Sequence, residues 1–184
     1  GRVISTAGPM GHTVTFLYDA KGQLVGLTNK DGTKVAITYD ANGNVLTVTD
    51  EEGYVVSYVY DKDGRMTQLT NARGFKTAYA YDKVGNLVRV TNAMDGVTAY
   101  VYDKNGNLLS ETNTDGGVTR YTYDKLNRVT SITDPEGAVT QVGYDANGNI
   151  TSSTDGNGNT TRYTYDGLDR ITQRTDEEGG VATQ

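Results

Sequence analysis

Apolar and polar side chains alternate over short stretches of the chain, as in residues 56–60 (VSYVY) and 119–123 (TRYTY). Side chains two residues apart lie on the same face of a β-strand, so the alternation predicts strands with paired tyrosines along one face. The stretches are about six residues long, a usual strand length, and turn-forming residues separate them. Glycine and other turn residues recur too often for a long helix. The pattern therefore predicts an all-β protein.

The predicted strands belong to a tandem repeat. Every Tyr-Asp dipeptide lies 21 residues after the previous one, with no insertion or deletion. A fixed period of this length indicates an array in which each unit is stabilised by its neighbours. With the tyrosine numbered as position 1, residues 1–17 form a partial copy, and the array fills residues 1–184 as one domain. The copies start at Tyr18, Tyr39, Tyr60, Tyr81, Tyr102, Tyr123, Tyr144 and Tyr165.

Each copy carries a turn signal directly after its tyrosine. Position 2 is always Asp, and position 5 is Gly except at Asn127 and Asp169. Gly, Asn and Asp tolerate a left-handed backbone, and Asp first with Gly fourth is typical of a type I turn with a glycine bulge. The hexapeptide YDANGN, identical at residues 39–44 and 144–149, is therefore predicted to end a strand, turn and start the return strand.

A second turn signal follows ten residues later. Position 12 is Asn or Asp, and position 15 is Gly in every copy but one, where Asp95 precedes Gly96. We interpret that exception as a local slip of the turn. Both prolines, Pro9 and Pro135, stand at position 13, where a turn accepts a fixed φ and needs no N–H donor. The sequence thus predicts antiparallel strands joined by turns equivalent to residues 19–22 and 29–32.

The odd length of the repeat constrains the side-chain pattern. Two hairpins with identical loops would return the apolar set to the opposite face of the sheet after 21 residues. One loop or bulge in each copy must therefore shift the alternation by one residue. The sequence leaves open which of the two turns carries this shift.

Composition excludes several classes of function. The chain has no cysteine, so disulfides and thiolate metal sites are excluded. Its net charge of −6 provides no basic surface for nucleic acid, and no apolar stretch reaches the roughly 18 residues of a membrane span. No signal peptide is visible, and the chain starts and stops inside repeats, as in a segment of a longer array. The 14 tyrosines supply contact area where aliphatic residues are few, which predicts a thin core.

Candidates for catalysis or metal binding are weak, and we expect no catalytic, cofactor-binding or metal-binding residue and no cofactor. His12, the single histidine, has no marked nucleophile or carboxylate partner. An Asp repeated in every copy suits a structural turn better than one asymmetric active site. Four Asp-x-Asn-x-Asn segments alternate oxygen atoms as a calcium loop does, but that loop also needs Gly at its sixth place and Glu at its twelfth. The segments begin at Asp40, Asp103, Asp145 and Asp155, and their sixth places hold Val45, Leu108, Ile150 and Thr160.

The periodic tyrosines leave two interpretations open. They can form a packed ladder in which each copy contacts the next, which their strict spacing favours. They can also stack against sugars, or contact cargo, if the ladder faces a cavity. The direction in which they face separates the two interpretations.

A 21-residue period of Tyr-Asp-x-x-Gly, an aliphatic residue and Thr-Asp/Asn-x-x-Gly resembles the Rhs or YD-repeat family over all 184 residues. That family includes bacterial Rhs and wall-associated polymorphic toxins, shell components of insecticidal toxin complexes and animal teneurins, and the regularity here resembles the bacterial members. The resemblance implies a curved antiparallel sheet of β-hairpins that spirals into a hollow shell around a C-terminal toxin. The family's self-cleaving core segment and toxin domain would follow such repeats, so no catalytic role is carried over to these residues.

Two functional hypotheses follow. The first is a non-catalytic structural scaffold, a shell segment that encapsulates or displays a C-terminal toxin in a secreted or cell-surface bacterial protein. Its partner is then toxin cargo of the same polypeptide or a component of the same complex. The alternative is an adhesion module that binds carbohydrate or a partner surface through the repeated tyrosines. We also expect edge-to-edge self-association through the terminal strands, which Ile4→Lys and Val181→Lys would weaken.

Overall fold

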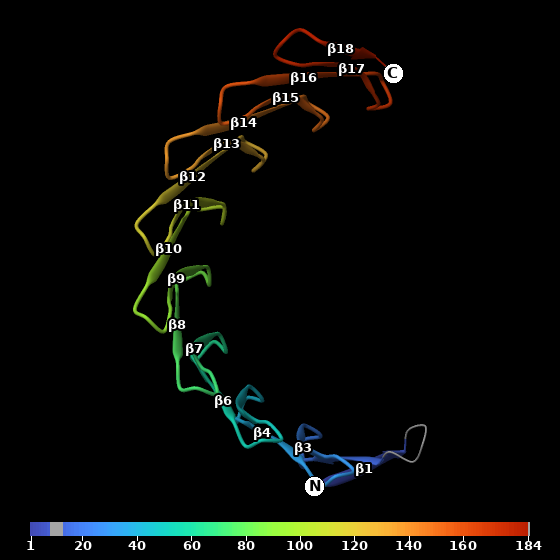
Figure 1. The fold of residues 1–184 in the computed structure, drawn as a ribbon, viewed down its shortest axis with the longest axis vertical. Helices are drawn as coiled ribbons and strands as arrows, with labels where there is room; N and C mark the ends of the chain where they lie inside the picture. The colour runs from blue at the N-terminus through green and yellow to red at the C-terminus, as the bar shows by residue number, and fades with distance from the viewer. Residues whose placement is uncertain (8–12, 184) are drawn as a thin grey trace. The chain divides into compact units, whose positions relative to one another are not determined.

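The computed structural model describes residues 1–7 and 13–183, and in those residues the chain forms β-strands joined by tight turns, with no helix (Figure 1). Each complete copy contributes two strands, so the predicted all-β, antiparallel fold is confirmed. Among these residues, no helix exists that would be long and apolar enough to cross a membrane. Pro9 and His12, singled out above, lie outside the described residues.

The strands are short and evenly spaced along the chain. They are β1 (Arg2–Ala7), β2 (Thr13–Tyr18), β3 (Leu24–Thr28), β4 (Lys34–Tyr39), β5 (Val45–Thr49), β6 (Val55–Tyr60), β7 (Met66–Thr70), β8 (Lys76–Tyr81), β9 (Leu87–Thr91), β10 (Val97–Tyr102), β11 (Leu108–Thr112), β12 (Val118–Tyr123), β13 (Val129–Thr133), β14 (Val139–Tyr144), β15 (Ile150–Thr154), β16 (Thr160–Tyr165), β17 (Ile171–Thr175) and β18 (Val181–Thr183).

The chain comprises two compact units, Gly1–Ala80 with Val90–Asp95 and Tyr81–Arg89 with Gly96–Gln184. In the first unit, each strand from β1 to β8 pairs antiparallel with the next strand in sequence. In the second unit, the same holds from β10 to β18. Each unit is thus a meander in which a hairpin pairs with the hairpins before and after it (Figure 1).

Both kinds of turn have the same backbone geometry. After Tyr39, the N–H of Gly43 donates to the carbonyl of Asp40 over 3.2 Å, and the N–H of Asp40 donates to the carbonyl of Asn44 over 2.9 Å. The second turn of that copy repeats the pattern, with Gly53 donating to Asp50 over 3.1 Å. These bonds close a three-residue loop with a type I turn and a glycine bulge. The turn type predicted from the Asp and Gly positions is confirmed.

The last residue of each loop has a left-handed backbone. Gly43 has a φ of 95°, and the two exceptions at position 5, Asn127 and Asp169, have φ values of 61° and 59°. Asp95 also has a φ of 61°, and its N–H donates to the carbonyl of Asn92 over 3.1 Å as glycine does elsewhere. The predicted slip of the turn at Asp95 is therefore wrong. Asp tolerates the left-handed region well enough to occupy the glycine position, so the turn keeps its register.

A bulge beside the Tyr-Asp turn provides the one-residue shift that the odd repeat length requires. Tyr39 pairs with Val45, but the preceding residue, Thr38, pairs with Thr47, so Leu46 is an extra residue on β5. The same register shift occurs beside Tyr18, Tyr60, Tyr102, Tyr123, Tyr144 and Tyr165. The ladder at the second turn runs without a shift, as between β5 and β6. The Tyr-Asp hairpin therefore carries the one-residue correction that keeps each face constant from copy to copy.

The two faces of the sheet differ in chemistry. Cross-strand pairs such as Tyr58 with Leu69 and Tyr60 with Met66 combine aromatic and aliphatic side chains on one face, as the alternation predicts. The other face carries pairs such as Ser57 with Thr70. On the first face Tyr58 and Tyr60 are half-buried.

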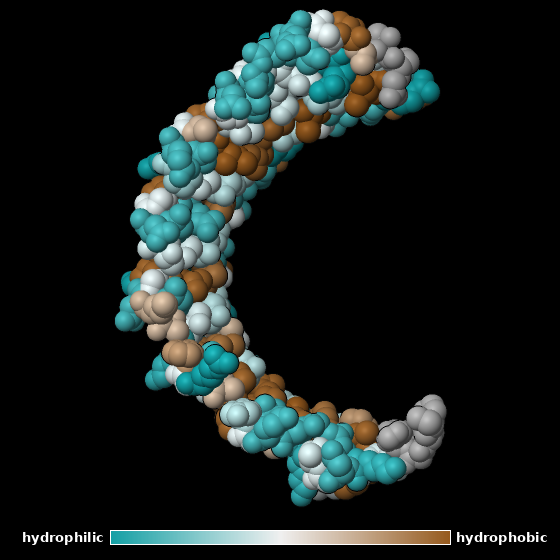
Figure 2. Space-filling view, in the orientation of Figure 1, coloured by the Kyte–Doolittle hydropathy of each residue, from teal (hydrophilic) through white to brown (hydrophobic). Residues whose placement is uncertain are grey.

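The sheet has no buried core. Among the residues whose burial the structure describes, none is buried, and several aliphatic side chains are exposed. Figure 2 shows hydrophobic residues interspersed with hydrophilic ones on the visible surface. Because no second layer covers the sheet in the described residues, stability must come from strand pairing, turns and contacts between neighbouring copies.

Candidate functional site

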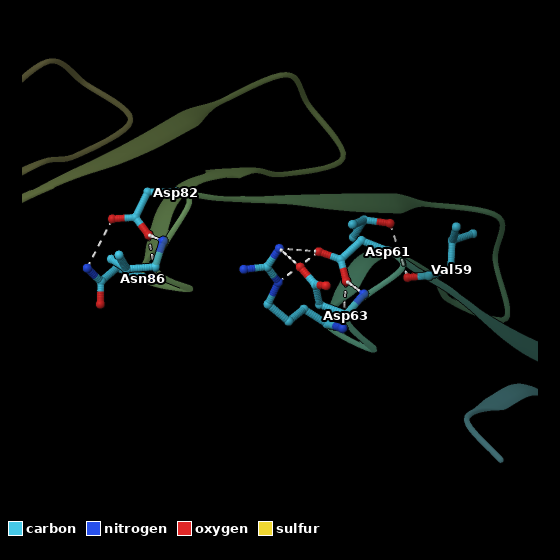
Figure 3. A network of polar contacts seen from close by, with 8 residues as sticks. Val59, Asp61, Asp63, Asp82 and Asn86 are labelled. Atoms are coloured by element: carbon cyan, nitrogen blue, oxygen red, sulfur yellow. Dashed lines mark hydrogen bonds and ion pairs between the residues drawn. The ribbon is translucent and has the colours of Figure 1, made fainter. Parts of the chain in front are cut away.

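The Asp at position 2 organises the loop that follows it. The Asp40 Oδ1 atom accepts the backbone N–H groups of Asn42 and Asn44, each over 2.9 Å, and Oδ2 accepts Nδ2 of Asn44 over 2.9 Å. Asp82 does the same with Val84 and Asn86 (Figure 3). One carboxylate therefore satisfies two backbone donors of the loop and fixes the side chain that directly precedes the return strand.

Arginine takes the role of this asparagine in other copies. Nε of Arg65 donates to Oδ2 of Asp61 over 2.8 Å, and its Nη2 atom lies 2.9 Å from Asp63 (Figure 3). Sequence reasoning missed the role of position 6, although a signal exists, since each of the eight copies that start with Tyr-Asp has a side-chain N–H donor there. These residues are Gln23, Asn44, Arg65, Asn86, Asn107, Arg128, Asn149 and Arg170.

The same bonds account for the Asp-x-Asn-x-Asn segments. In the segments that begin at Asp40, Asp103, Asp145 and Asp155, the last asparagine donates its amide to the aspartate over 2.9–3.1 Å. The amide therefore presents N–H rather than oxygen to the loop. In the described parts of the chain, no group of three or more His, Cys, Asp or Glu side chains is arranged to hold a metal ion.

The turn bonds lower the pKa of several carboxyl groups. The side-chain amides of Asn44 and Asn107 hold the pKa of Asp40 and of Asp103 below the ordinary value of 3.8. At Asp124, the backbone N–H of Arg128 is the main cause of the lowered pKa, and its guanidinium adds to the effect. The charged form of each aspartate is thus favoured by the folded turn.

We expect the protein to lose stability in acid. A carboxyl group whose pKa is lower in the folded state contributes fully above its unfolded value of 3.8, and that contribution is lost as the pH falls through the folded pKa. The thermal midpoint should stay level from about pH 7 to about pH 5 and fall below about pH 4. The variant Asn44→Ala should return the pKa of Asp40, followed by NMR, toward its ordinary value. A midpoint that does not change down to about pH 2 would contradict the role of these turns.

The tyrosine at position 1 connects its own copy to the preceding one. The hydroxyl of Tyr39 donates to the carbonyl of Leu24 over 2.8 Å. The ladder between β3 and β4 ends at the pair Gly26 and Ala36, so Leu24 lies beyond the paired residues. The tyrosine hydroxyl therefore supplies a donor at the end of this ladder, where the paired residues of β3 and β4 stop. Equivalent bonds of 2.8–3.0 Å join Tyr123 to Leu108, Tyr144 to Val129 and Tyr165 to Ile150.

Further contacts between copies follow the edge formed by the Tyr-Asp turns. The guanidinium carbon of Arg128 lies 4.4 Å from the ring centre of Tyr144, a cation–π distance. Where position 5 is not glycine, its side chain accepts bonds from the preceding copy. Asn127 accepts from Asn105 over 3.1 Å and from Asn107 over 2.7 Å.

The same contact occurs in the last pair of copies. Oδ1 of Asp169 accepts Nδ2 of Asn147 over 3.0 Å and Nδ2 of Asn149 over 2.7 Å. The exceptions at position 5 thus do more than tolerate a left-handed backbone. They bind the asparagines at positions 4 and 6 of the preceding copy. These residues are far apart in the sequence, and only strand pairing brings them into contact.

This contact predicts different outcomes for equivalent glycine substitutions. Gly64 has a φ of 79°, and a Cβ atom there would lie 3.8 Å from Oδ1 of Asn44. The same atom at Gly22 would have no neighbour within 4 Å. Gly22→Asn should cost about 1 kcal/mol of unfolding free energy, whereas Gly64→Asn should cost less because Asn42 and Asn44 can donate to the new side chain. Gly64→Val should cost about 2 kcal/mol, since a β-branched residue is strained at this φ.

Urea unfolding of the three variants measures these differences. Equal losses for Gly64→Asn and Gly22→Asn would show that no contact forms with the preceding copy. Equal losses for Gly64→Asn and Gly64→Val would contradict the backbone requirement.

The fold and its contacts define a tandem β-repeat scaffold, in which each copy is one supersecondary unit that hydrogen-bonds to its neighbours. The family model for the RHS repeat matches residues 1–34, 39–76, 81–117, 102–139 and 144–181. The chain therefore belongs to the RHS repeat family, as the resemblance of its sequence indicated.

Solved structures of toxin-complex proteins share the fold. A chain of the TcdB2-TccC3 crystal structure is 18% identical to this chain, with a TM-score of 0.68. The match covers 97% of this chain and 12% of the TcdB2-TccC3 chain. TcdB2-TccC3 without its hypervariable C-terminal region is 17% identical, with a TM-score of 0.68 over 94% of this chain and 12% of its own. The Photorhabdus luminescens Tc holotoxin pore is 17% identical, with a TM-score of 0.59 over 100% of this chain and 13% of its own. No curated protein sequence matches the chain significantly.

Proposed function

We propose that the chain is a segment of the wall of an Rhs-type shell that encloses or displays a C-terminal toxin. The observation that supports this most directly is the coreless sheet of the described residues, whose copies are joined by tyrosine hydroxyls. A single layer stabilised by nearest neighbours can extend over any number of copies, because each added copy brings its own contacts. Residues 1–184 act together in this proposal as one repeat array.

The structural relatives favour the same role. One is a Tc holotoxin pore, and another carries a hypervariable C-terminal region in its complete form. By analogy, this chain belongs to a secreted or cell-surface bacterial protein, and its partner is toxin cargo on the same polypeptide or in the same complex. The aspartates at position 2 and the tyrosines at position 1 have structural roles, because they form the turns and the contacts between copies. In this proposal the chain itself does not catalyse a reaction.

Protease protection of the cargo tests this proposal. The natural polypeptide that carries these repeats is digested in the native state, and the domain that follows the repeats is compared with the same domain expressed alone. An enclosing wall should slow cleavage of the domain strongly. The combined variant Tyr123→Phe, Tyr144→Phe and Tyr165→Phe should remove the protection at a lower urea concentration. Equal cleavage rates for the attached and the isolated domain would overturn the proposal.

Carbohydrate binding through the tyrosine face is the second candidate function. It is favoured by the half-buried aromatic side chains that share one face, such as Tyr58 and Tyr60. An open groove of about 630 Å³ also lies beside Tyr39 and Asp40. Titration with oligosaccharides, followed by tyrosine fluorescence, should then show saturable quenching that Tyr58→Ala weakens. Unchanged fluorescence would remove this candidate.

A further inference from the structure

We propose that Asn42–Gly43 is a site of spontaneous deamidation whose reactivity is set by the neighbouring copy. The hexapeptide YDANGN occurs at residues 39–44 and again at residues 144–149. The two stretches are identical in sequence and fold into the same turn, yet the asparagine amides at their fourth positions have different surroundings. The proposal concerns this difference, and it does not depend on the proposed function.

The chemistry requires only the chain and water. The backbone nitrogen of Gly43 attacks Cγ of Asn42, the amide nitrogen leaves as ammonia, and a five-membered succinimide forms. Water then opens the ring at one of its two carbonyl groups, which gives aspartate or isoaspartate. Glycine favours the attack because it has no Cβ atom to hinder its nitrogen.

Asn42 is free to react in this way. Its side chain is exposed, and its backbone N–H donates to Asp40 over 2.9 Å. Within the described residues its side-chain amide has no hydrogen-bond partner, because position 5 of the next copy is Gly64. The leaving nitrogen is therefore unrestrained.

The equivalent asparagine in the second hexapeptide is restrained. Asn147 is also exposed, but its Nδ2 atom donates to Oδ1 of Asp169 over 3.0 Å. This bond fixes the side chain and holds the leaving group. A restrained side chain reaches the geometry of attack less often, so this bond slows deamidation.

Two further Asn-Gly pairs extend the comparison. Asn105 is exposed, and its Nδ2 atom donates to Oδ1 of Asn127 over 3.1 Å. Asn157 precedes Gly158 in a turn of the second kind, and the described residues provide no partner for its side-chain amide. We therefore expect Asn105 to be slow, as Asn147 is, and Asn157 to be fast.

The products would weaken the turn that contains Asn42. Aspartate places a second negative charge in the loop beside the carboxylate of Asp40. Isoaspartate inserts an extra backbone carbon into a three-residue loop, which disrupts the bonds between Asp40 and the N–H groups of residues 42 and 44. Deamidation thus marks one hairpin of the array for local opening.

The experiment is a peptide map of the native chain after incubation at mildly alkaline pH. We expect Asn42 to react about fivefold faster than Asn147, the rate ratio that corresponds to one ordinary hydrogen bond. In denaturant the two rates should be equal, because the local sequences are identical. Asp169→Gly should raise the rate at Asn147 about fivefold, and Gly64→Asn should lower the rate at Asn42 about fivefold.

These two substitutions exchange the residue types found at position 5, so both variants should fold, and urea unfolding verifies this. Native rates for Asn42 and Asn147 within a factor of about two would overturn the proposal, given the expected ratio for one hydrogen bond. Rates that neither substitution changes would also overturn it.

Discussion

Deletion of Leu46 is expected to lower the free energy of unfolding by about 4 kcal/mol, more than most single substitutions. Leu46 is the extra residue of the bulge on β5, between Val45, which pairs with Tyr39, and Thr47, which pairs with Thr38. Without it, the alternation after the turn shifts by one residue. Either Val48 moves to the polar face, or the hairpin forms in a strained register.

Deletion of a complete copy is the matched control. Removal of residues 39–59 takes out 21 residues, leaves the period intact and keeps every side chain on its face. That variant should unfold cooperatively, with a smaller loss than the deletion of one residue. Urea unfolding monitored by tyrosine fluorescence measures both. A smaller loss for the single deletion would contradict the assignment of the bulge as the element that keeps the faces constant.

Replacement of three tyrosines by phenylalanine is expected to cost about 3 kcal/mol, or about 1 kcal/mol for each lost hydroxyl. Tyr123, Tyr144 and Tyr165 each donate to a backbone carbonyl of the preceding copy over 2.8–3.0 Å. Phenylalanine keeps the ring and leaves the carbonyl without this donor. The sites lie a full copy apart, so their effects should add.

The control uses tyrosines of the same face whose hydroxyls make no hydrogen bond within the described residues. Tyr121→Phe and Tyr163→Phe should each cost well below 1 kcal/mol. Midpoints in urea for both sets provide the comparison. If the two sets lose equal stability per substitution, the hydroxyl bonds between copies do not contribute as proposed.

Local conformational preferences explain why much of the fold could be predicted. The requirement for a left-handed residue at position 5 limits that position to Gly, Asn and Asp, and the observed φ values at Asn127 and Asp169 follow from it. Asp at position 2 acts on N–H groups two and four residues away, so its effect also lies within a few residues. The same preference applies at Asp95, whose φ of 61° shows that Asp replaces glycine in the second turn as Asp169 does in the first.

The sequence by itself determined the repeat, the strands, the turn type and the placement of paired tyrosines on one common face, because each depends on residues that are close along the chain. The tertiary structure decided which hairpin carries the bulge, because a bulge is a relation between two paired strands. It also decided which side chains meet across copies, as Tyr39 meets Leu24 and Asp169 meets Asn147. Those partners are 15 and 22 residues apart, and only the register of the strands between them brings them into contact.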